Sequence, residues 1–338
     1  MYCSVQGSLE GGGILKRYIF VTVLFGMVVF PVRNAGAQTE RYPSKPIRLL
    51  VPFPPGGSVD LVARLVTPKL SESIGQPIVI DNRSGASGNI AAELVARAAP
   101  DGYTLMVHTI PLVANTFLYS RVPYNVLNDF APVSLLTSST SVLAVHPSLP
   151  AHTVRELLEL AKSKPGGLNY ASAGVGTNPH ITGELFNYLG KVNIVAVQFK
   201  GGGPALIATM SGEIGITFTN LAETSVYVKA NRLRALGITS TKRSAVLPDV
   251  PTIAEAGLPG YEFITWHGLL TSKGTPRAIV ALLSDRLRQT MRAPDQAKIF
   301  EQRGLDVIAS SPEEFSAHLK KELEKWGRVI KERGMKAD

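Results

Sequence analysis

Short apolar runs alternate with helical patterns along most of the 338-residue chain, and Gly and Pro stand between them. The first example is the apolar stretch 47–51, which predicts a strand. It leads through Pro52-Phe-Pro-Pro-Gly-Gly57 into a segment whose apolar positions Leu61, Val62 and Leu65 follow at helical spacing. Regular alternation of this kind indicates an α/β fold.

Three further strand–loop–helix units follow the same plan. Each apolar strand runs into a polar or glycine-containing loop, and each loop opens a helix. The strand, loop and helix of the three units are 77–80, 81–88 and 89–97; 168–172, 173–178 and 179–186; and 194–199, 200–203 and 204–208. Ligands of open α/β sheets bind beyond the carboxyl ends of the strands, where such loops gather. Two units in each half of the chain therefore predict two facing lobes with a ligand cleft between them.

The glycines of the first loop predict an anion site. Gly56 and Gly57 leave the backbone bare, so a ligand can approach the first free N–H groups of the following helix. The helix dipole favours a carboxylate or a phosphate at that position. One loop of this type is more often an ordinary strand-to-helix turn, but its repetition in four units favours a ligand site.

The N-terminal residues predict a secretory signal. Lys16 and Arg17 precede the uncharged, mostly apolar run 18–32, and Ala35-Gly-Ala37 supplies a small-x-small cleavage pattern. The apolar run is shorter than the roughly 20 residues that a membrane-spanning helix needs. We therefore expect residues 1–37 to be a signal peptide that is cleaved near Ala37.

Composition excludes several kinds of chemistry. The single cysteine, Cys3, lies within the predicted signal, so neither a disulfide nor thiol chemistry is expected. The formal net charge of +9 could attract anionic solutes or simply favour solubility. No Lys/Arg cluster with interleaved aromatic residues indicates nucleic acid. The six histidines form no metal-binding spacing, so we expect no metal and no cofactor.

Nucleotide-binding and hydrolase motifs are incomplete. No stretch matches the phosphate-binding loop GxxxxGK[ST], and Pro179 stands where a dinucleotide fingerprint beginning at Gly174 needs its third glycine. Gly85-Ala-Ser-Gly88 is one residue too short for a GxSxG nucleophile elbow. No acid/base pair of carboxylates is recognisable. We therefore expect a binding protein and no enzyme, with an exported α/β hydrolase or lyase acting on a small carboxylate as the alternative.

Eight short motifs follow one another in the order of a known family. They are Tyr42-Pro-Ser-Lys-Pro-Ile-Arg48, Pro52-Phe-Pro-Pro-Gly-Gly-Ser-Val-Asp60, Pro100-Asp-Gly-Tyr-Thr-Leu105, Tyr170-Ala-Ser-Ala-Gly-Val-Gly-Thr177, Leu233-Arg-Ala-Leu236, Leu247-Pro-Asp-Val-Pro-Thr252, Glu255-Ala-Gly-Leu-Pro-Gly-Tyr261 and Gly274-Thr-Pro276. Together they closely resemble the substrate-binding proteins of tripartite tricarboxylate transporters, also called the Bug family. The resemblance covers residues 40–338.

The resemblance implies a periplasmic-binding-protein fold of type II, in which two α/β lobes close on a solute. It also implies two crossings between the lobes, which we place near Val142 and Phe263. The expected domains are the signal peptide at 1–37, a first lobe at 38–142 plus 263–338, and a second lobe at 143–262.

The same resemblance implies a ligand and partners. The ligand would be a small carboxylate, gripped by loop backbone N–H groups, helix N-termini, hydroxyls and ordered waters. The receptor would deliver it to the membrane subunits of a tripartite tricarboxylate-type transporter or report it to a sensor protein. We expect a monomer in the periplasm, without a nucleic acid partner.

The expected binding residues fall into two groups, one for each lobe. They are Phe53, Pro55, Gly56, Gly57 and Asp60 in the first, and Ser172, Gly174, Gly176, Thr177, His180, Lys200 and Gly201 in the second. Asp60 is expected to reach back and order the first loop. His180 could contact the anion or only pack at the helix start, and Lys200 could be solvated. Weaker candidates, equally suited to turns or caps, are Ser84, Ser87 and Asn115.

Two loops depart from the family pattern. The second loop reads Asn82-Arg-Ser-Gly85, whereas the family commonly has a proline before this glycine. The fourth unit reads Gln198-Phe-Lys200, whereas the family commonly has a tyrosine before the lysine. If the missing phenolic hydroxyl serves the ligand, the preferred carboxylate differs from those of the family.

Overall fold

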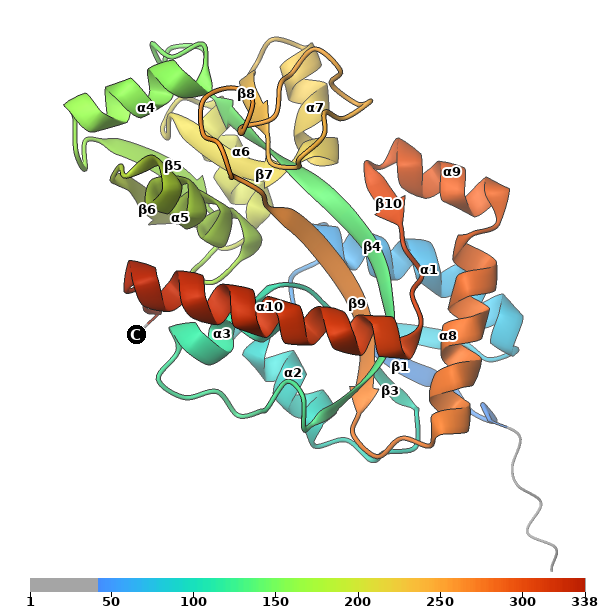
Figure 1. The fold of residues 1–338 in the computed structure, drawn as a ribbon. Coiled ribbons are helices and arrows are strands. Elements are labelled where there is room, and N and C mark those ends of the chain that lie inside the picture. Colours follow the sequence, from blue (N-terminus) through green and yellow to red (C-terminus); the bar gives the residue numbers. More distant parts are fainter. Residues whose placement is uncertain (1–41, 338) are drawn as a thin grey trace, which may run out of the picture. The chain divides into compact units, whose positions relative to one another are not determined.

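The computed structural model describes residues 42–337, whose ten strands fall into two sheets that share one long strand (Figure 1). The first sheet contains β1 (Ile47–Val51), β2 (Ile78–Asn82), β3 (Thr104–His108), β9 (Ile264–Ser272), β10 (Leu305–Val307) and residues 130–140 of β4 (Phe130–Val145). The second contains β5 (Leu168–Ser172), β6 (Ile194–Gln198), β7 (Ile216–Asn220), β8 (Arg234–Ile238) and residues 141–145 of β4. Each sheet with its covering helices is one lobe, and the predicted α/β architecture is confirmed.

The strands β4 and β9 join the two lobes. Thr140 of β4 pairs with Ile264 of β9, whereas the next residue, Ser141, pairs with Asn220 of β7. The chain returns at the start of β9, where the N–H group of Phe263 donates to the carbonyl oxygen of Thr239 at 2.9 Å. One strand therefore changes its partners within a single residue step, and a second strand runs beside it.

Most helices of the first lobe bury apolar residues against its sheet. The helices of this lobe are α1 (Ser58–Ile74), α2 (Asn89–Ala96), α3 (Pro111–Leu118), α8 (Arg277–Met291) and α9 (Pro294–Gln302). In α1 the buried residues Val59, Val62 and Val66 recur at helical spacing. The helix ends at Gly75, whose φ of 73° is the left-handed conformation that favours glycine.

The second lobe has the same construction. Its helices are α4 (Val154–Ser163), α5 (Asn178–Gly190), α6 (Gly202–Met210) and α7 (Leu221–Lys229). In α5, Gly183 lies directly on the ring of Tyr170, and a Cβ atom there would come within 2.5 Å of that ring. The four predicted strand–loop–helix units are therefore all present, as β1–α1, β2–α2, β5–α5 and β6–α6.

The long helix α10 (Pro312–Arg333) packs beside the joining strands and contacts both lobes (Figure 1). It lies against β4 and α3, and it also reaches α5 of the second lobe. The buried Glu322 accepts hydrogen bonds from the indole nitrogens of Trp266 in β9, at 2.8 Å, and Trp326, at 2.9 Å. Trp266 is thus a packing residue.

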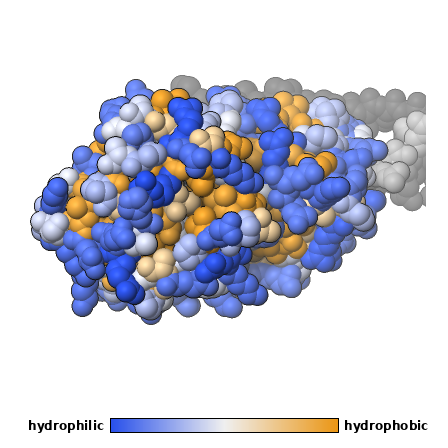
Figure 2. All heavy atoms as spheres, turned by 90° about the horizontal axis from the view of Figure 1, so that it is seen from above, coloured by the Kyte–Doolittle hydropathy of each residue, from blue (hydrophilic) through white to orange (hydrophobic). Residues whose placement is uncertain are grey.

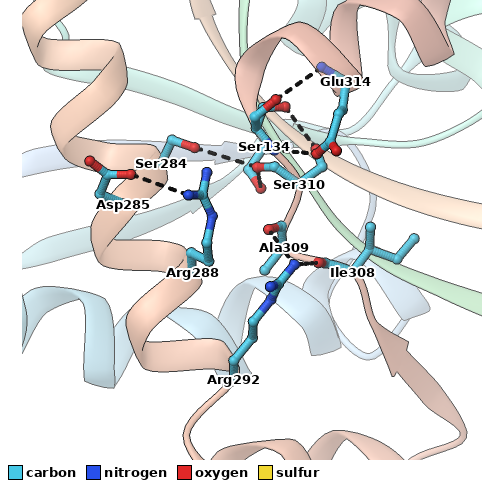
Figure 3. A network of polar contacts seen from close by, with 10 residues as sticks. Ser134, Ser284, Asp285, Arg288, Arg292, Ile308, Ala309, Ser310 and Glu314 are labelled. Carbon is cyan, nitrogen blue, oxygen red and sulfur yellow. Dashed lines mark hydrogen bonds and ion pairs between the residues drawn. The ribbon is translucent and has the colours of Figure 1, made fainter.

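The segment between β10 and α10 is fastened to β4 and α8 (Figure 3). Ser134 of β4 donates through Oγ to the carbonyl oxygen of Ser310 at 2.9 Å, and Ser310 Oγ accepts the N–H group of Leu135 at 3.0 Å. Arg292 at the end of α8 donates to the carbonyl oxygen of Ile308 at 2.8 Å. Glu314 completes a capping box at the start of α10. These bonds fix where α10 begins relative to the joining strands.

The surface is mixed. Seen from above, it is mostly hydrophilic, with apolar residues gathered toward the middle (Figure 2). Large apolar side chains that face solvent include Ile207 of α6 and Val226 of α7, which are 62% and 58% exposed. Within residues 42–337, no helix combines the length and apolar character needed to cross a membrane. The predicted signal peptide and its cleavage site lie outside the described residues.

Candidate functional site

The loops that follow the parallel strands gather at one edge of each sheet. β1, β2 and β3 run parallel, as do β5, β6 and β7, so the carboxyl ends of each set share an edge. In the first lobe this edge carries the loops 52–57 and 83–88, and in the second it carries the loops 173–177 and 199–201. The predicted binding residues all lie in or directly beside these loops.

Asp60 braces the first loop from the first turn of α1. Its side chain is 3% exposed. Oδ2 accepts hydrogen bonds from the N–H group of Gly56 at 3.0 Å and from Nε of Arg64 at 2.8 Å. Oδ1 accepts the side-chain amide of Asn82 at 3.0 Å, and the same amide nitrogen donates to the carbonyl oxygen of Phe53 at 3.0 Å. The expectation that Asp60 reaches back to order this loop is confirmed.

The charge of Asp60 is satisfied within this arrangement. Burial by itself raises the pKa of the carboxyl, but hydrogen bonds from Arg64, the Gly56 N–H group and Asn82 outweigh it and lower the pKa below its ordinary value. Asp60 is therefore ionised at neutral pH and saturated with donors. Its role here is to hold the loop.

The second-lobe loop is closed on itself by two hydroxyl groups. Ser172 is fully buried, and its Oγ donates to the carbonyl oxygen of Gly174 at 3.2 Å. Oγ1 of Thr177 donates to the same oxygen at 2.6 Å. The N–H group of Gly201 donates to the carbonyl oxygen of Ala173 at 3.2 Å, which ties this loop to the loop after β6. Ser172, Gly174, Thr177 and Gly201 are therefore brought together.

His180 packs at the start of α5. It is 8% exposed, and its Nδ1 accepts the N–H group of Gly176 at 3.2 Å. Burial lowers the pKa of the ring, and nearby Glu184 opposes this only in part. A ring that accepts from its own loop is neutral and positions that loop, so the geometry favours packing between the two roles considered for this residue.

Helix N-termini at this edge are bare. The N-cap residues of α1, α5 and α6 are Gly57, Thr177 and Gly201, and none of them forms a side-chain cap hydrogen bond. The helices α4 and α10, away from this edge, are capped by Thr153 and Ser311. α8 and α9 also begin without a cap, so the absence of a cap is not confined to this edge.

The open space beside the glycines is more particular. A Cβ atom built on Gly56, Gly201 or Gly202 would meet nothing within 4 Å, and one on Gly57 would meet only a carbonyl oxygen at 3.9 Å. Pro55 and Lys200 are exposed next to these glycines. Two lobes thus present uncapped helix starts with room in front of them, and such starts attract anions.

The two edges touch each other, and the first-lobe residues at the contact, Ser87 and Asn115, were only weak candidates. Ser87 Oγ, in the loop after β2, donates to the carbonyl oxygen of Val175 in the loop after β5. Gly176 lies against α3: a Cβ atom there would come within 2.6 Å of Asn115 Oδ1. The first and second lobes are therefore in direct contact at their loop edges.

Two further residues at these edges were not predicted from the sequence as site residues. Asn82 is the last residue of β2, directly before the loop that departs from the family pattern, and its position opposite Val51 is the signal that could have found it. Glu223 lies in the first turn of α7, directly after β7, and burial raises its pKa to about 7. No motif marks Glu223.

No metal centre is apparent in the described part of the chain. Across residues 42–337, His, Cys, Asp and Glu side chains form no group of three or more that could hold a metal ion.

A family model decides the identity of the chain. The model described as "Tripartite tricarboxylate transporter family receptor" matches residues 62–335. The chain belongs to this receptor family. The protein BugT of Bordetella pertussis is 33% identical over 322 residues, which are 94% of this chain and 99% of BugT. The resemblance to the Bug family is therefore confirmed.

Solved structures give the same result for the fold. The protein Rpa4515 of R. palustris, solved with adipate, is 36% identical and superposes with a TM-score of 0.83 over 87% of this chain and 99% of that chain. MatC of Rhodopseudomonas palustris, with bound malate, is 34% identical, with a TM-score of 0.80 over 86% of this chain and 100% of that chain. The receptor thus has the two-lobed periplasmic-binding-protein fold expected from the sequence.

Membership in a receptor family also settles the general class of function. The family consists of substrate-binding proteins, so the receptor is not an enzyme. The alternative of a hydrolase or lyase is therefore wrong.

Proposed function

We propose that this receptor captures a small carboxylate outside the cytoplasm, between its two lobes, for delivery to a tripartite tricarboxylate-type transporter or to a sensor protein. The binding residues would be the loop residues predicted from the sequence in both lobes, with Asp60 and His180 acting by holding these loops in place. The backbone N–H groups at the starts of α1, α5 and α6 would hold the anion, with ordered waters completing the contacts.

One observation carries the proposal: uncapped helix N-termini with glycines in open space stand at the loop edges of both lobes, and these edges touch. Gly57 before α1 and Gly201 before α6 represent the two sides. A dicarboxylate has one negative group for each side. Adipate and malate, bound by two related proteins, are both dicarboxylates, which supports this ligand class.

The domain boundaries belong to the proposal. We place the first lobe at 38–142 plus 263–338 and the second at 143–262. The change of partner between Thr140 and Ser141 of β4 supports the first boundary, and the start of β9 at Ile264 supports the second. The proposed location is the periplasm, after removal of residues 1–37, and the proposed oligomeric state is a monomer.

A thermal unfolding series tests the proposal directly. The mature chain, residues 38–338, is heated alone and with adipate, malate, glucose or choline. A ligand at a hundredfold excess over its Kd adds about 2.7 kcal/mol to the unfolding free energy, which gives a readily measured rise in Tm. We expect a rise with at least one dicarboxylate and none with glucose or choline.

A variant separates binding at the proposed site from binding elsewhere. Gly57→Leu fills the space before α1 without a backbone clash, because a Cβ atom there meets only the Pro54 carbonyl oxygen, at 3.9 Å. Its Tm without ligand should match that of the wild type, and its response to the dicarboxylate should disappear. A full response in Gly57→Leu, or a response of the wild type to glucose alone, contradicts the proposal.

A further inference from the structure

The contact between the loop edges rests on a side chain that is held in place from several directions. Ser87 adopts a φ of 51°, which non-glycine residues rarely adopt. Asn115 of α3 donates through Nδ2 to the carbonyl oxygen of Ser87 at 3.1 Å, and the hydroxyl of Tyr119 donates to Ser87 Oγ at 3.3 Å. The hydroxyl of Ser87 is thereby aimed at the Val175 carbonyl oxygen across the lobe boundary.

Asn115 is itself fixed within the first lobe. It is fully buried, and its Nδ2 also donates to Oδ1 of Asn89 at 2.8 Å. The hydroxyl of Tyr124 donates to the same Asn89 oxygen at 2.9 Å. The chain therefore builds a polar cluster under the loop 85–88, and the cluster faces the second lobe.

On the other side of the contact, only glycine fits. Gly176 has a φ of 76°, and a Cβ atom there would lie 2.6 Å from Asn115 Oδ1 and 3.1 Å from Leu118 Cδ1. Both neighbours belong to α3 of the first lobe. The bare backbone at Gly176 thus allows the loop 173–177 to approach α3 as closely as it does.

We propose that Ser87, positioned by Asn115 and Tyr119, is a latch that holds the lobes together by bonding the loop 173–177, with Gly176 as the close-fitting surface. The proposal rests on the proposed function, in which the lobes close on a solute. The latch raises the affinity for the solute because it stabilises the closed form, and Ser87 itself does not contact the solute. Ser87 is a positioning residue, and its bond slows the opening of the closed form.

Two substitutions weaken the latch in different ways, one by removing a hydrogen bond and the other by adding a clash. Ser87→Ala removes the bond across the boundary, and we expect the solute to dissociate about 2- to 10-fold faster, the range for one hydrogen bond, with an unchanged association rate. Gly176→Ala places a methyl group against Asn115, and we expect more than a tenfold loss of affinity.

Matched controls are available in the same chain. The hydroxyl of Ser73 donates to a backbone carbonyl oxygen inside α1 at 2.8 Å, so Ser73→Ala loses the same type of bond away from the boundary. Gly166 has a φ of 73°, but the nearest atom to a Cβ atom there is 3.6 Å away, so Gly166→Ala brings similar backbone strain without a contact between lobes. Neither control should change the dissociation rate.

Closure itself is measured by the distance between spin labels on two cysteines. The mature chain contains no cysteine, and Leu94 of α2 and Ile207 of α6 are exposed sites on different lobes. Pulsed electron resonance with and without adipate or malate then gives the fraction of closed molecules. We expect a smaller closed fraction in Ser87→Ala and Gly176→Ala than in the wild type and both controls.

The outcomes separate the two proposals. If neither acid binds the wild type, the ligand part of the proposed function fails, while the label distances without solute still test the latch by comparing Gly176→Ala with Gly166→Ala. If solute binds and Ser87→Ala dissociates and closes like the wild type, the latch is overturned and the proposed function stands. Equal effects of Ser87→Ala and Ser73→Ala also overturn the latch, because they indicate a general loss of stability.

Discussion

Asp60 shows how a single charge organises a binding loop. Asp60→Asn removes the negative charge of the carboxylate that accepts hydrogen bonds from Arg64 and the Gly56 N–H group. We expect the unfolding free energy to fall by about 1–3 kcal/mol at pH 7. Because the folded pKa is depressed, this stabilisation is present above the unfolded pKa and is lost as pH falls through the folded pKa. Urea unfolding of both proteins should show the difference at pH 7 and little difference well below about pH 4.

Asp285→Asn is the control for Asp60→Asn. The Asp285 side chain is 61% exposed and lies 3.6 Å from Arg288, so its loss should change the unfolding free energy by less than about 1 kcal/mol. A similar loss in the two variants would mean that the effect of Asp60 is one of overall charge. A difference that persists in acid would mean that the bonds, and not the ionised carboxylate, carry the stability.

The residue scale also marks what the sequence could reveal. The bracing role of Asp60 was predictable because its donors lie mostly within the same turn and helix. The bond from Ser87 to Val175 was not, because it joins loops 88 positions apart and depends on how the two sheets meet. Sequence patterns report local geometry, whereas contacts between lobes depend on the three-dimensional arrangement.

At the scale of elements, α10 is fastened to β9 by a carboxylate that serves two tryptophans. Glu322→Leu leaves the indole N–H groups of Trp266 and Trp326 buried without an acceptor. Each unsatisfied donor costs about 1–3 kcal/mol, so we expect a loss of about 2–6 kcal/mol in unfolding free energy. Glu322→Gln retains one acceptor oxygen and should lose less. Urea unfolding monitored by tryptophan fluorescence measures both.

Glu324 provides the comparison on the same helix. It is exposed on α10, so Glu324→Gln should unfold like the wild type. If Glu322→Leu were as stable as Glu324→Gln, the two indoles would have other acceptors and the bond between helix and strand would not matter.

The elements themselves were largely predictable, because their apolar periodicity is local. The strand at Ile47–Val51 and the helix after it follow the pattern directly. The division of β4 between two sheets does not, since the run from Phe130 to Val145 is largely buried along its length and carries no mark at Ser141. The family resemblance alone placed a crossing, near Val142, because by its apolar pattern a joining strand looks like any other buried strand.

At the scale of the whole molecule, buried histidines make the fold sensitive to acid. Burial lowers the pKa of His108 to about 4 and that of His267 to about 3, below their ordinary value. Between these values and about pH 6.5 the unfolded chain binds more protons than the folded one, so stability falls as the pH falls, by about 1.4 kcal/mol per pH unit for each histidine. Burial lowers the pKa of His180 and His318 as well, which adds to the loss.

Glu223 acts in the opposite direction. Burial raises its pKa to about 7. Between about pH 7 and pH 4.5 the Glu223 carboxyl is therefore protonated in the folded protein but ionised in the unfolded chain. The stability gained from this proton as the pH falls offsets the stability lost through one histidine. Glu223→Gln removes the offset. Urea unfolding at pH 7, 6 and 5 measures the effect. As the pH falls, the unfolding free energy of Glu223→Gln should decrease more steeply than that of the wild type, by about 1.4 kcal/mol per pH unit. Glu324→Gln should follow the wild type. Parallel pH profiles for all three proteins would mean that the Glu223 carboxyl is hydrated in the folded state and does not take up this proton.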